Sequence, residues 1–311
     1  MTSSTVHSFA KPAALCALVA LASALAACSG ATAASDESAD GGGQFAVDSS
    51  TLVFGVVPDS VETETNYQPL MDYIAAETGK QVEYHESTDY AALIEAAVAG
   101  KIDVASFSGF TYVTAKNNGA QITPISSIVT AEGGEPGYYS EAIVPAGSPI
   151  TSIDEFGGKK VCFVDPSSTS GYLFPSYNLI EAGIDPELDI TPVFVGKHDV
   201  SVQKVAQGIE CEVGFAEDSE VAKSDEVTSI LRTQVPGAPI VVSDVLPEDL
   251  RTQLTDTLSH VTIDEIIASG IESADTDGFR SVFYATEPVD DAYYDTIRDI
   301  CEVTNATQCQ G

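Results

Sequence analysis

Short apolar runs alternate with amphipathic stretches along most of the chain. Residues 52–57 form a continuous apolar run that stops at a proline, which is typical of a buried strand. Residues 67–78 then place apolar side chains at helical spacing and end before a glycine. Strand patterns follow at residues 82–84 and 102–107, with a helical pattern at residues 90–99 between them. This alternation predicts an α/β fold in which parallel strands are covered by helices.

A second unit with the same alternation begins near residue 148. Its strand and helix patterns lie at residues 161–164, 170–182, 191–195, 200–208 and 211–215. The helical tail that follows is expected to pack on the first unit. We therefore predict two lobes, with residues 51–142 plus 241–311 as a discontinuous lobe 1 and residues 143–240 as lobe 2. Two crossings of the chain between lobes create a hinge and an inter-lobe cleft, which suits a protein that closes around a ligand.

The segment before the first strand has the pattern of an export address. A hydrophobic run at residues 13–27 follows Lys11, with no acidic residue before it, as in a signal peptide. Leu25-Ala26-Ala27-Cys28 resembles a bacterial lipobox, which implies cleavage before Cys28 and lipidation of that cysteine. We expect residues 1–27 to be the signal peptide and residues 28–50 to be the lipidated cysteine and a flexible tether. An uncleaved anchor helix or an ordinary cleavage site are the alternatives.

The charge and the cysteines fit an exported protein that does not bind nucleic acid. The chain has 13 Lys and Arg against 47 Asp and Glu, a formal net charge of −34, and such a field repels nucleic acid. Cys16 is lost with the signal peptide and Cys28 carries the lipid, so four cysteines remain, and they allow three disulfide pairings in an oxidising compartment. We favour Cys162–Cys211, in two strand-like runs, and Cys301–Cys309, which would close a short loop. A zinc site is the weaker alternative because no C-x-x-C spacing is present.

One hydroxyl-rich segment predicts an anion site. Asp165-Pro166-Ser167-Ser168-Thr169-Ser170-Gly171 follows a predicted strand and opens a predicted helix. The first turn of a helix has unpaired N–H groups and a positive dipole end, and hydroxyl groups add further donors. Together they can hold a tetrahedral oxyanion without Lys or Arg. The alternative is an ordinary serine N-cap, which accounts for one hydroxyl only.

Two further polar residues are placed where strands end. His198 lies between a strand and a helix, where it would face the cleft and donate to a phosphoryl oxygen. Asp218 follows the next strand and could accept a hydrogen bond from an amine or an acid proton of a ligand. A capping or surface histidine, and an aspartate that caps the next helix, are the alternatives.

These segments resemble the phosphate-, phosphite- and phosphonate-binding proteins of ABC importers, which include the aminoethylphosphonate binder. The resemblance covers about residues 52–302. Asp165-Pro166-x-Ser168-Thr169-Ser170-Gly171 is similar to the turn that grips the phosphonate, and Gly196-x-His198-Asp199 to the ligand histidine. The cleft tyrosines and the C-terminal segment are matched by Asp89-Tyr90, Pro136-Gly137-Tyr138, Gly278-Phe279 and Tyr293-Tyr294-Asp295-x-Ile297-Arg298.

The resemblance implies a two-lobed, type II periplasmic-binding-protein-like fold, with two parallel or mixed sheets flanked by helices. It implies an extracytoplasmic solute-binding lipoprotein, held at the cell membrane by its lipid. This protein would be a monomer that captures a small phosphorus oxyanion and delivers it to an ABC permease. Neither catalysis nor a cofactor or metal is expected. The implied ligand-binding residues are Tyr90, Tyr138, Ser168, Thr169, Ser170, His198 and Asp218.

The resemblance departs from the family pattern at one position. Aminophosphonate binders hold the ligand amine with two acidic residues, one of which matches Asp218. The other falls in a turn that reads Pro236-Gly237-Ala238-Pro239 here, and Ala238 cannot pair with an ammonium group. Phosphite, a small alkylphosphonate or phosphate are therefore the expected ligands.

Two other functional classes remain open. Ser168 or Ser170, His198 and Asp218 occur in the order Ser–His–Asp, which permits a hydrolase reading, but the nucleophile elbow G-x-S-x-G is absent. An adhesin or partner lipoprotein with an unused cleft is the third possibility.

Overall fold

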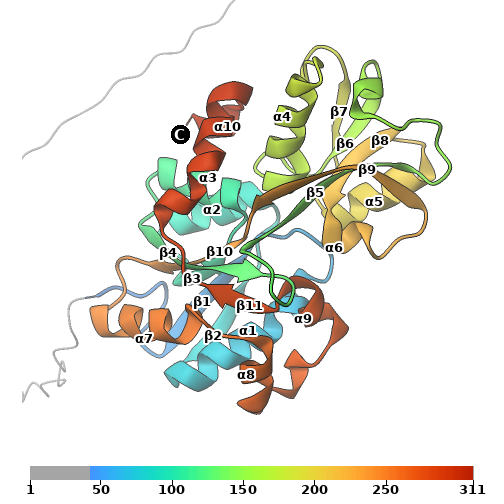
Figure 1. The fold of residues 1–311 in the computed structure, drawn as a ribbon. Coiled ribbons are helices and arrows are strands. Elements are labelled where there is room, and N and C mark those ends of the chain that lie inside the picture. The colour runs from blue at the N-terminus through green and yellow to red at the C-terminus, as the bar shows by residue number, and fades with distance from the viewer. Residues whose placement is uncertain (1–42, 311) are drawn as a thin grey trace, which may run out of the picture. The chain divides into compact units, whose positions relative to one another are not determined.

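The computed structural model describes residues 43–310 (Figure 1). The predicted signal peptide, Cys28 and residues 28–42 of the predicted tether lie outside the described residues. The last part of that predicted tether is attached to the fold, because Gln44 N donates to Val245 O and Ala46 N donates to Asp103 Oδ1. Within residues 43–310, no helix combines the length and the apolar composition needed to cross a bilayer.

The first set of strands is a mixed sheet. Its strands are β1 (Thr51–Val56), β2 (Gln81–His85), β3 (Val104–Ser106), β4 (Ile122–Val129), β10 (Pro239–Ser243) and β11 (Ala285–Glu287). They follow the order β2-β1-β3-β10-β4, with β11 on the other edge of β4. β1 pairs in parallel with β2 and β3, whereas β10 returns antiparallel between β3 and β4. Every residue of β1 is buried, which explains its continuous apolar run.

Helices cover both faces of this first set of strands, as Figure 1 shows. Apolar residues of α2 (Tyr90–Val98), α3 (Gly109–Asn117) and α10 (Asp295–Thr304) form the core on one face. The other face is packed by α1 (Thr63–Thr78), α7 (Glu248–Leu258), α8 (Ile263–Ala268) and α9 (Asp277–Val282). Single 3-10 turns lie at Glu272–Ala274, Asp291–Tyr294 and Thr307–Cys309.

The second set of strands has its own helices and core. Its strands are β5 (Gly137–Pro145), β6 (Lys160–Phe163), β7 (Thr191–Phe194), β8 (Val213–Glu217) and β9 (Val227–Pro236). They are ordered β5-β8-β6-β7, and β9 pairs antiparallel with the whole of β5. The helical segments are a 3-10 turn at Ile153–Phe156, a π-helical turn at Thr169–Leu173, α4 (Phe174–Glu181), α5 (His198–Gln207) and α6 (Asp218–Val221).

The two expected sheets are joined through one residue pair. Val129 at the end of β4 pairs in parallel with Gly137 at the start of β5, so the hydrogen-bonded array of 11 strands is continuous. The C-terminal helix α10 also bridges the two sets, because it contacts both α3 and α4. We expected this tail to pack on the first unit, and it packs on both. Residues at or after the carboxyl ends of β1, β3, β6 and β8 line one cavity at the seam between the two sets.

Both favoured disulfides are present. Cys162 in β6 is bonded to Cys211, which lies just before β8, with a Cα–Cα distance of 5.5 Å. Cys301 in α10 is bonded to Cys309, with a Cα–Cα distance of 5.7 Å. The first bridge ties together the two strands that lead into the predicted anion turn and into Asp218.

Candidate functional site

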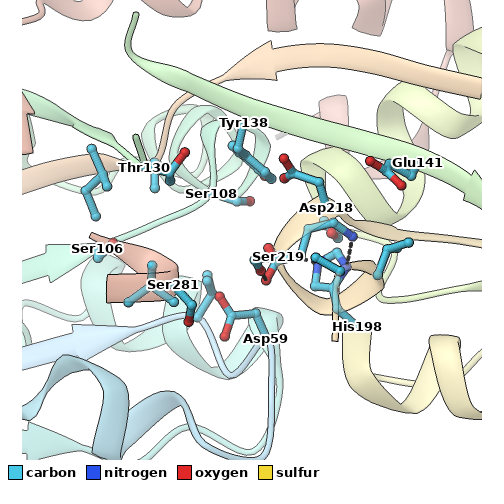
Figure 2. Close-up of a pocket in the computed structure, with 18 of the residues that line it drawn as sticks. Asp59, Ser106, Ser108, Thr130, Tyr138, Glu141, His198, Asp218, Ser219 and Ser281 are labelled. Carbon is cyan, nitrogen blue, oxygen red and sulfur yellow. Dashed lines mark hydrogen bonds and ion pairs between the residues drawn. The ribbon is translucent and has the colours of Figure 1, made fainter. Parts of the chain in front are cut away.

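A cavity of about 630 Å³ lies at the seam between the two sets of strands (Figure 2). Five of the seven predicted ligand residues line it, namely Tyr90, Tyr138, Ser168, His198 and Asp218. Ala238, which the sequence analysis singled out, also lines it. Thr169 and Ser170 are fully buried and are not among the lining residues, although they adjoin Ser168 in the same turn.

The hydroxyl-rich turn has three distinct hydrogen-bonding roles. Ser168 caps the following helix, since its Oγ accepts from Gly171 N at 3.0 Å. Thr169 Oγ1 accepts from Phe110 N, in the first turn of α3, at 2.8 Å. Ser170 Oγ is buried without a hydrogen-bond partner among the described residues. The N-cap interpretation therefore describes Ser168 alone, whereas Thr169 joins two helix starts and Ser170 keeps a free hydroxyl.

Helix starts from both sets of strands surround the cavity. Asp89 caps α2 through Ala92 N at 2.8 Å, which places Tyr90 in the first turn of that helix. Ser108 caps α3 and lines the cavity, and it was not among the predicted ligand residues. Its signal in the sequence is the Ser-Gly pair directly after a strand pattern. The positive ends of these helices and their hydroxyl groups favour an anion in the cavity.

His198 is a neutral donor. It is the first residue of α5, and its backbone N donates to Asp59 O at 2.8 Å. Its Nδ1 accepts from Glu217 N at 2.9 Å, so the ring proton lies on Nε2. Burial lowers the pKa of His198 to about 4, although nearby carboxylates act in the opposite direction. The imidazole can therefore donate one hydrogen bond near neutral pH without carrying a charge.

Asp218 is engaged by the protein itself. Its Oδ1 accepts from Tyr139 N at 3.1 Å and its Oδ2 accepts from Arg232 at 2.7 Å. Arg232 also pairs with Glu141 at 3.1 Å, and its guanidinium lies 3.6 Å from the centre of the Tyr139 ring. Because a cation already balances it, Asp218 is less available to a ligand proton than the sequence suggested.

Two carboxyl groups that the sequence interpretation missed line the same cavity. Asp59 lies on the loop after β1, and Glu217 is the last residue of β8. Burial and, to a smaller extent, the negative charge of Glu217 raise the pKa of Asp59 to about 7. Burial likewise raises the pKa of Glu217 to about 7. The available signal was their position just beyond apolar runs, but each is one acid among 47.

Each lysine and arginine among the described residues that line the cavity is paired with a carboxylate. Lys223 pairs with Glu220 at 2.7 Å, and Arg280 pairs with Asp275 at 2.7 Å. Arg232 is held by the two carboxylates described above. Among the described lining residues, a bound anion would therefore be held by neutral hydroxyl, imidazole and backbone donors. Tyr138 belongs to these donors, because burial and Glu217 raise the pKa of its hydroxyl far above the usual value.

The raised pKa of Asp59 predicts how stability depends on pH. The folded protein favours the protonated form of Asp59. The stability that this form contributes is therefore fully present below the unfolded-state pKa of 3.8 and is lost as the pH rises through about 7. We expect Asp59→Asn, which cannot ionise, to gain about 2–4 kcal/mol relative to wild type across that interval. Urea denaturation of both proteins at a series of pH values measures this difference. Two curves that run parallel from pH 4 to pH 7.5 would contradict the assignment.

The geometry does not form a hydrolytic triad. Within residues 43–310, no hydrogen bond joins Ser168, His198 and Asp218. Ser168 Oγ accepts from a backbone N–H, His198 Nδ1 is occupied by Glu217 N, and Asp218 faces Arg232. A serine nucleophile needs a base within hydrogen-bond reach, and that base needs an orienting partner.

Comparisons with known proteins identify the family of the chain. Residues 54–286 match the family described as "ABC transporter, phosphonate, periplasmic substrate-binding protein". The chain is 34% identical to the phosphate-import protein PhnD of Mycolicibacterium smegmatis, with 98% of each chain covered.

Two solved structures share the fold at low sequence identity. PhnD1 of Prochlorococcus marinus, in complex with methylphosphonate, has a TM-score of 0.70 at 17% identity, covering 83% of this chain and 99% of that one. The binding-protein component of an ABC phosphonate transporter from Pseudomonas aeruginosa has a TM-score of 0.69 at 21% identity, covering 83% and 87%. The family match extends over most of the chain, and its members are transport proteins and not enzymes. The chain therefore belongs to the periplasmic substrate-binding proteins of ABC phosphonate transporters, with the two-lobed α/β fold of that family.

Proposed function

We propose that this protein captures a small phosphorus oxyanion in the cavity at the seam and delivers it to an ABC permease. The observation that carries this proposal is the cavity wall, where neutral donors converge and every described lining cation is already paired. Such a wall suits a compact oxyanion that accepts many hydrogen bonds. Inorganic phosphate, phosphite and a small alkylphosphonate fit this description.

The proposed ligand contacts come from both lobes. Tyr90 belongs to residues 51–142 plus 241–311, which we propose as lobe 1, whereas His198 belongs to residues 143–240, the proposed lobe 2. Closure would bring these donors around one oxyanion. The full proposed set is Tyr90, Tyr138, Ser168, Thr169, Ser170, His198 and Asp218. Ala238 at the cavity wall supports a ligand without an amine, since an alanine cannot balance an ammonium group.

We also propose that the protein is a lipoprotein. Removal of residues 1–27 would leave Cys28 as the lipidated N-terminus, and the segment up to Gln44 would serve as the leash. A lipid on a short leash keeps the binding protein close to its permease. Mass spectrometry of the N-terminal peptide from the native membrane fraction tests this, because lipidated Cys28 carries a diagnostic mass increase.

Calorimetry against phosphate, phosphite, methylphosphonate and aminoethylphosphonate tests the main proposal. We expect saturable binding of at least one of the first three, and weaker binding of aminoethylphosphonate than of methylphosphonate. No heat and no thermal stabilisation with any of the four would refute phosphorus-oxyanion capture.

Thr169→Ala is expected to weaken binding by about 10-fold or more, because a hydrogen bond to a charged group contributes about 1.5–3 kcal/mol. The variant removes a donor for the ligand and also the acceptor that Phe110 N uses at 2.8 Å. Thr169→Ser keeps the hydroxyl group and is the matched control, with affinity expected within about threefold of wild type. An affinity change below twofold in Thr169→Ala would show that the threonine hydroxyl has no role in ligand binding.

A further inference from the structure

Two carboxyl groups face the cavity from opposite lobes. Asp59 lies on the loop that joins β1 to α1, and Glu217 ends β8. Figure 2 shows Asp59 on the same side of the cavity as His198, opposite Tyr138 and Ser108. Each carboxyl is held by a hydroxyl group, since Thr63 Oγ1 donates to Asp59 Oδ1 at 2.6 Å and Ser219 Oγ donates to Glu217 Oε1 at 2.7 Å. Both carboxyls therefore have fixed positions.

The Asp59 loop is attached to the opposite lobe by its backbone. Lys197 Nζ donates to Pro58 O at 3.2 Å and to Ser60 O at 2.9 Å, and His198 N donates to Asp59 O. Because Lys197 bonds to these carbonyl oxygens, it does not pair with the Asp59 carboxylate. In contrast, Asp218 has Arg232 as its partner. Among the described lining residues, no lysine or arginine forms an ion pair with Asp59 or Glu217, and the neutral His198 places its Nε2 3.9 Å from Glu217 Oε2.

The charged and titratable groups around Asp59 do not neutralise it. They are Tyr67 of α1, Tyr84 of β2, Tyr90 of α2, Tyr138 of β5, Lys197 and His198 at the start of α5, Glu217 of β8 and Glu220 of α6. The tyrosines stay protonated because their pKa values are raised, and His198 is neutral. Lys197 bonds to the backbone carbonyls, and the two glutamates repel a negative charge on Asp59.

We propose that Asp59, together with Glu217, makes the cavity selective for an oxyanion that carries its own proton. This inference rests on the proposed function and names the protonation state of its ligand. A carboxylate beside a bare oxyanion is unfavourable unless a proton lies between them, whereas a P–OH group supplies that proton as a hydrogen bond. Phosphorus oxyanions have their second ionisation near neutral pH and so retain this proton in part. Sulfate and sulfonates are fully ionised and retain none.

Methylphosphonate and methanesulfonate form the sharpest test pair. The monoanions have the same charge and nearly the same shape, and they differ in one proton. In wild type at pH 8, where Asp59 and Glu217 with pKa values of about 7 are mostly ionised, we expect methylphosphonate to bind about 10- to 100-fold more tightly in calorimetry, the range that one charged hydrogen bond produces. At pH 5 the ratio is expected to shrink, because protonated carboxyls can donate to the sulfonate. Phosphate and sulfate serve as a second pair.

Asp59→Asn supplies an amide that can donate to either ligand, so the ratio at pH 8 is expected to fall below about threefold. Glu217→Gln is expected to lower it as well, and it keeps the test valid if Asp59→Asn does not fold. Glu62→Gln removes one negative charge from the exposed part of the same loop and is expected to keep the wild-type ratio.

Equal affinity of wild type for methylphosphonate and methanesulfonate at pH 8 would overturn the inference, as would an unchanged ratio in both carboxyl variants. Phosphorus-oxyanion capture would survive either result. Failure of every phosphorus ligand to bind would overturn both proposals.

Discussion

Gly171→Ala is expected to weaken ligand binding by about 100-fold and to destabilise the second lobe by about 1–3 kcal/mol. A Cβ atom at this position would lie 2.4 Å from Val164 Cβ and 2.9 Å from Ser168 Oγ. Neither neighbour can withdraw, because Val164 N donates to Gly171 O and Gly171 N donates to Ser168 Oγ. The whole turn must therefore shift, and this moves several hydroxyl and backbone donors away from the ligand together.

Gly157→Ala is the matched control in the same lobe. Its added methyl group meets no atom within 4 Å, and its φ of −52° is open to any residue. We expect unchanged affinity and equal or slightly higher stability, because alanine restricts the unfolded chain. Calorimetry and urea denaturation report the two quantities separately. Wild-type affinity in Gly171→Ala would show that the turn is not the ligand grip.

Removing the Cys162–Cys211 bridge by a double substitution to alanine is expected to lower the free energy of unfolding by about 4 kcal/mol. The bridge spans 49 positions, so its loss releases much conformational entropy in the unfolded chain. Both cysteines are fully buried, and alanine avoids placing a hydroxyl group in their apolar surroundings. Urea denaturation under non-reducing conditions measures the loss.

The Cys301–Cys309 bridge provides the comparison. It spans only 8 positions, and the same entropy argument gives about 2.5 kcal/mol for its removal. The long bridge should therefore matter more than the short one. The reverse order would mean that strain or residual structure in the unfolded chain outweighs loop closure.

Buried strands could be predicted from the sequence because they form apolar runs, and the partly exposed β2 and β7 were predicted as well. β1 is buried throughout and produces an uninterrupted apolar run, and β6 is apolar except at its first residue. β9 has mostly exposed or half-exposed side chains, so no apolar run marks it. Its strand conformation comes from hydrogen bonding to β5, a partner that the local sequence does not reveal.

The same distinction applies to the candidate site. The turn at residues 165–171 is contiguous, and its hydroxyl groups are visible as one motif. Asp59 and Glu217 are brought together only by the packing of two lobes, so no local pattern links them. Asp218 was assigned from its position after a strand, but the Arg232 that pairs with it lies on β9, the strand that was missed.

The choice of neutral donors in the cavity has a consequence for the order of events in transport. A surface with a net charge of −34 offers an approaching anion no long-range attraction. Dipoles and hydroxyl groups act only over a few ångströms, so they do not make one small anion enter the cavity faster than another. Recognition then takes place after entry, through residence time and not through the rate of encounter. The protein therefore discriminates through the dissociation rate. An anion that the cavity does not hold dissociates before the lobes engage the permease.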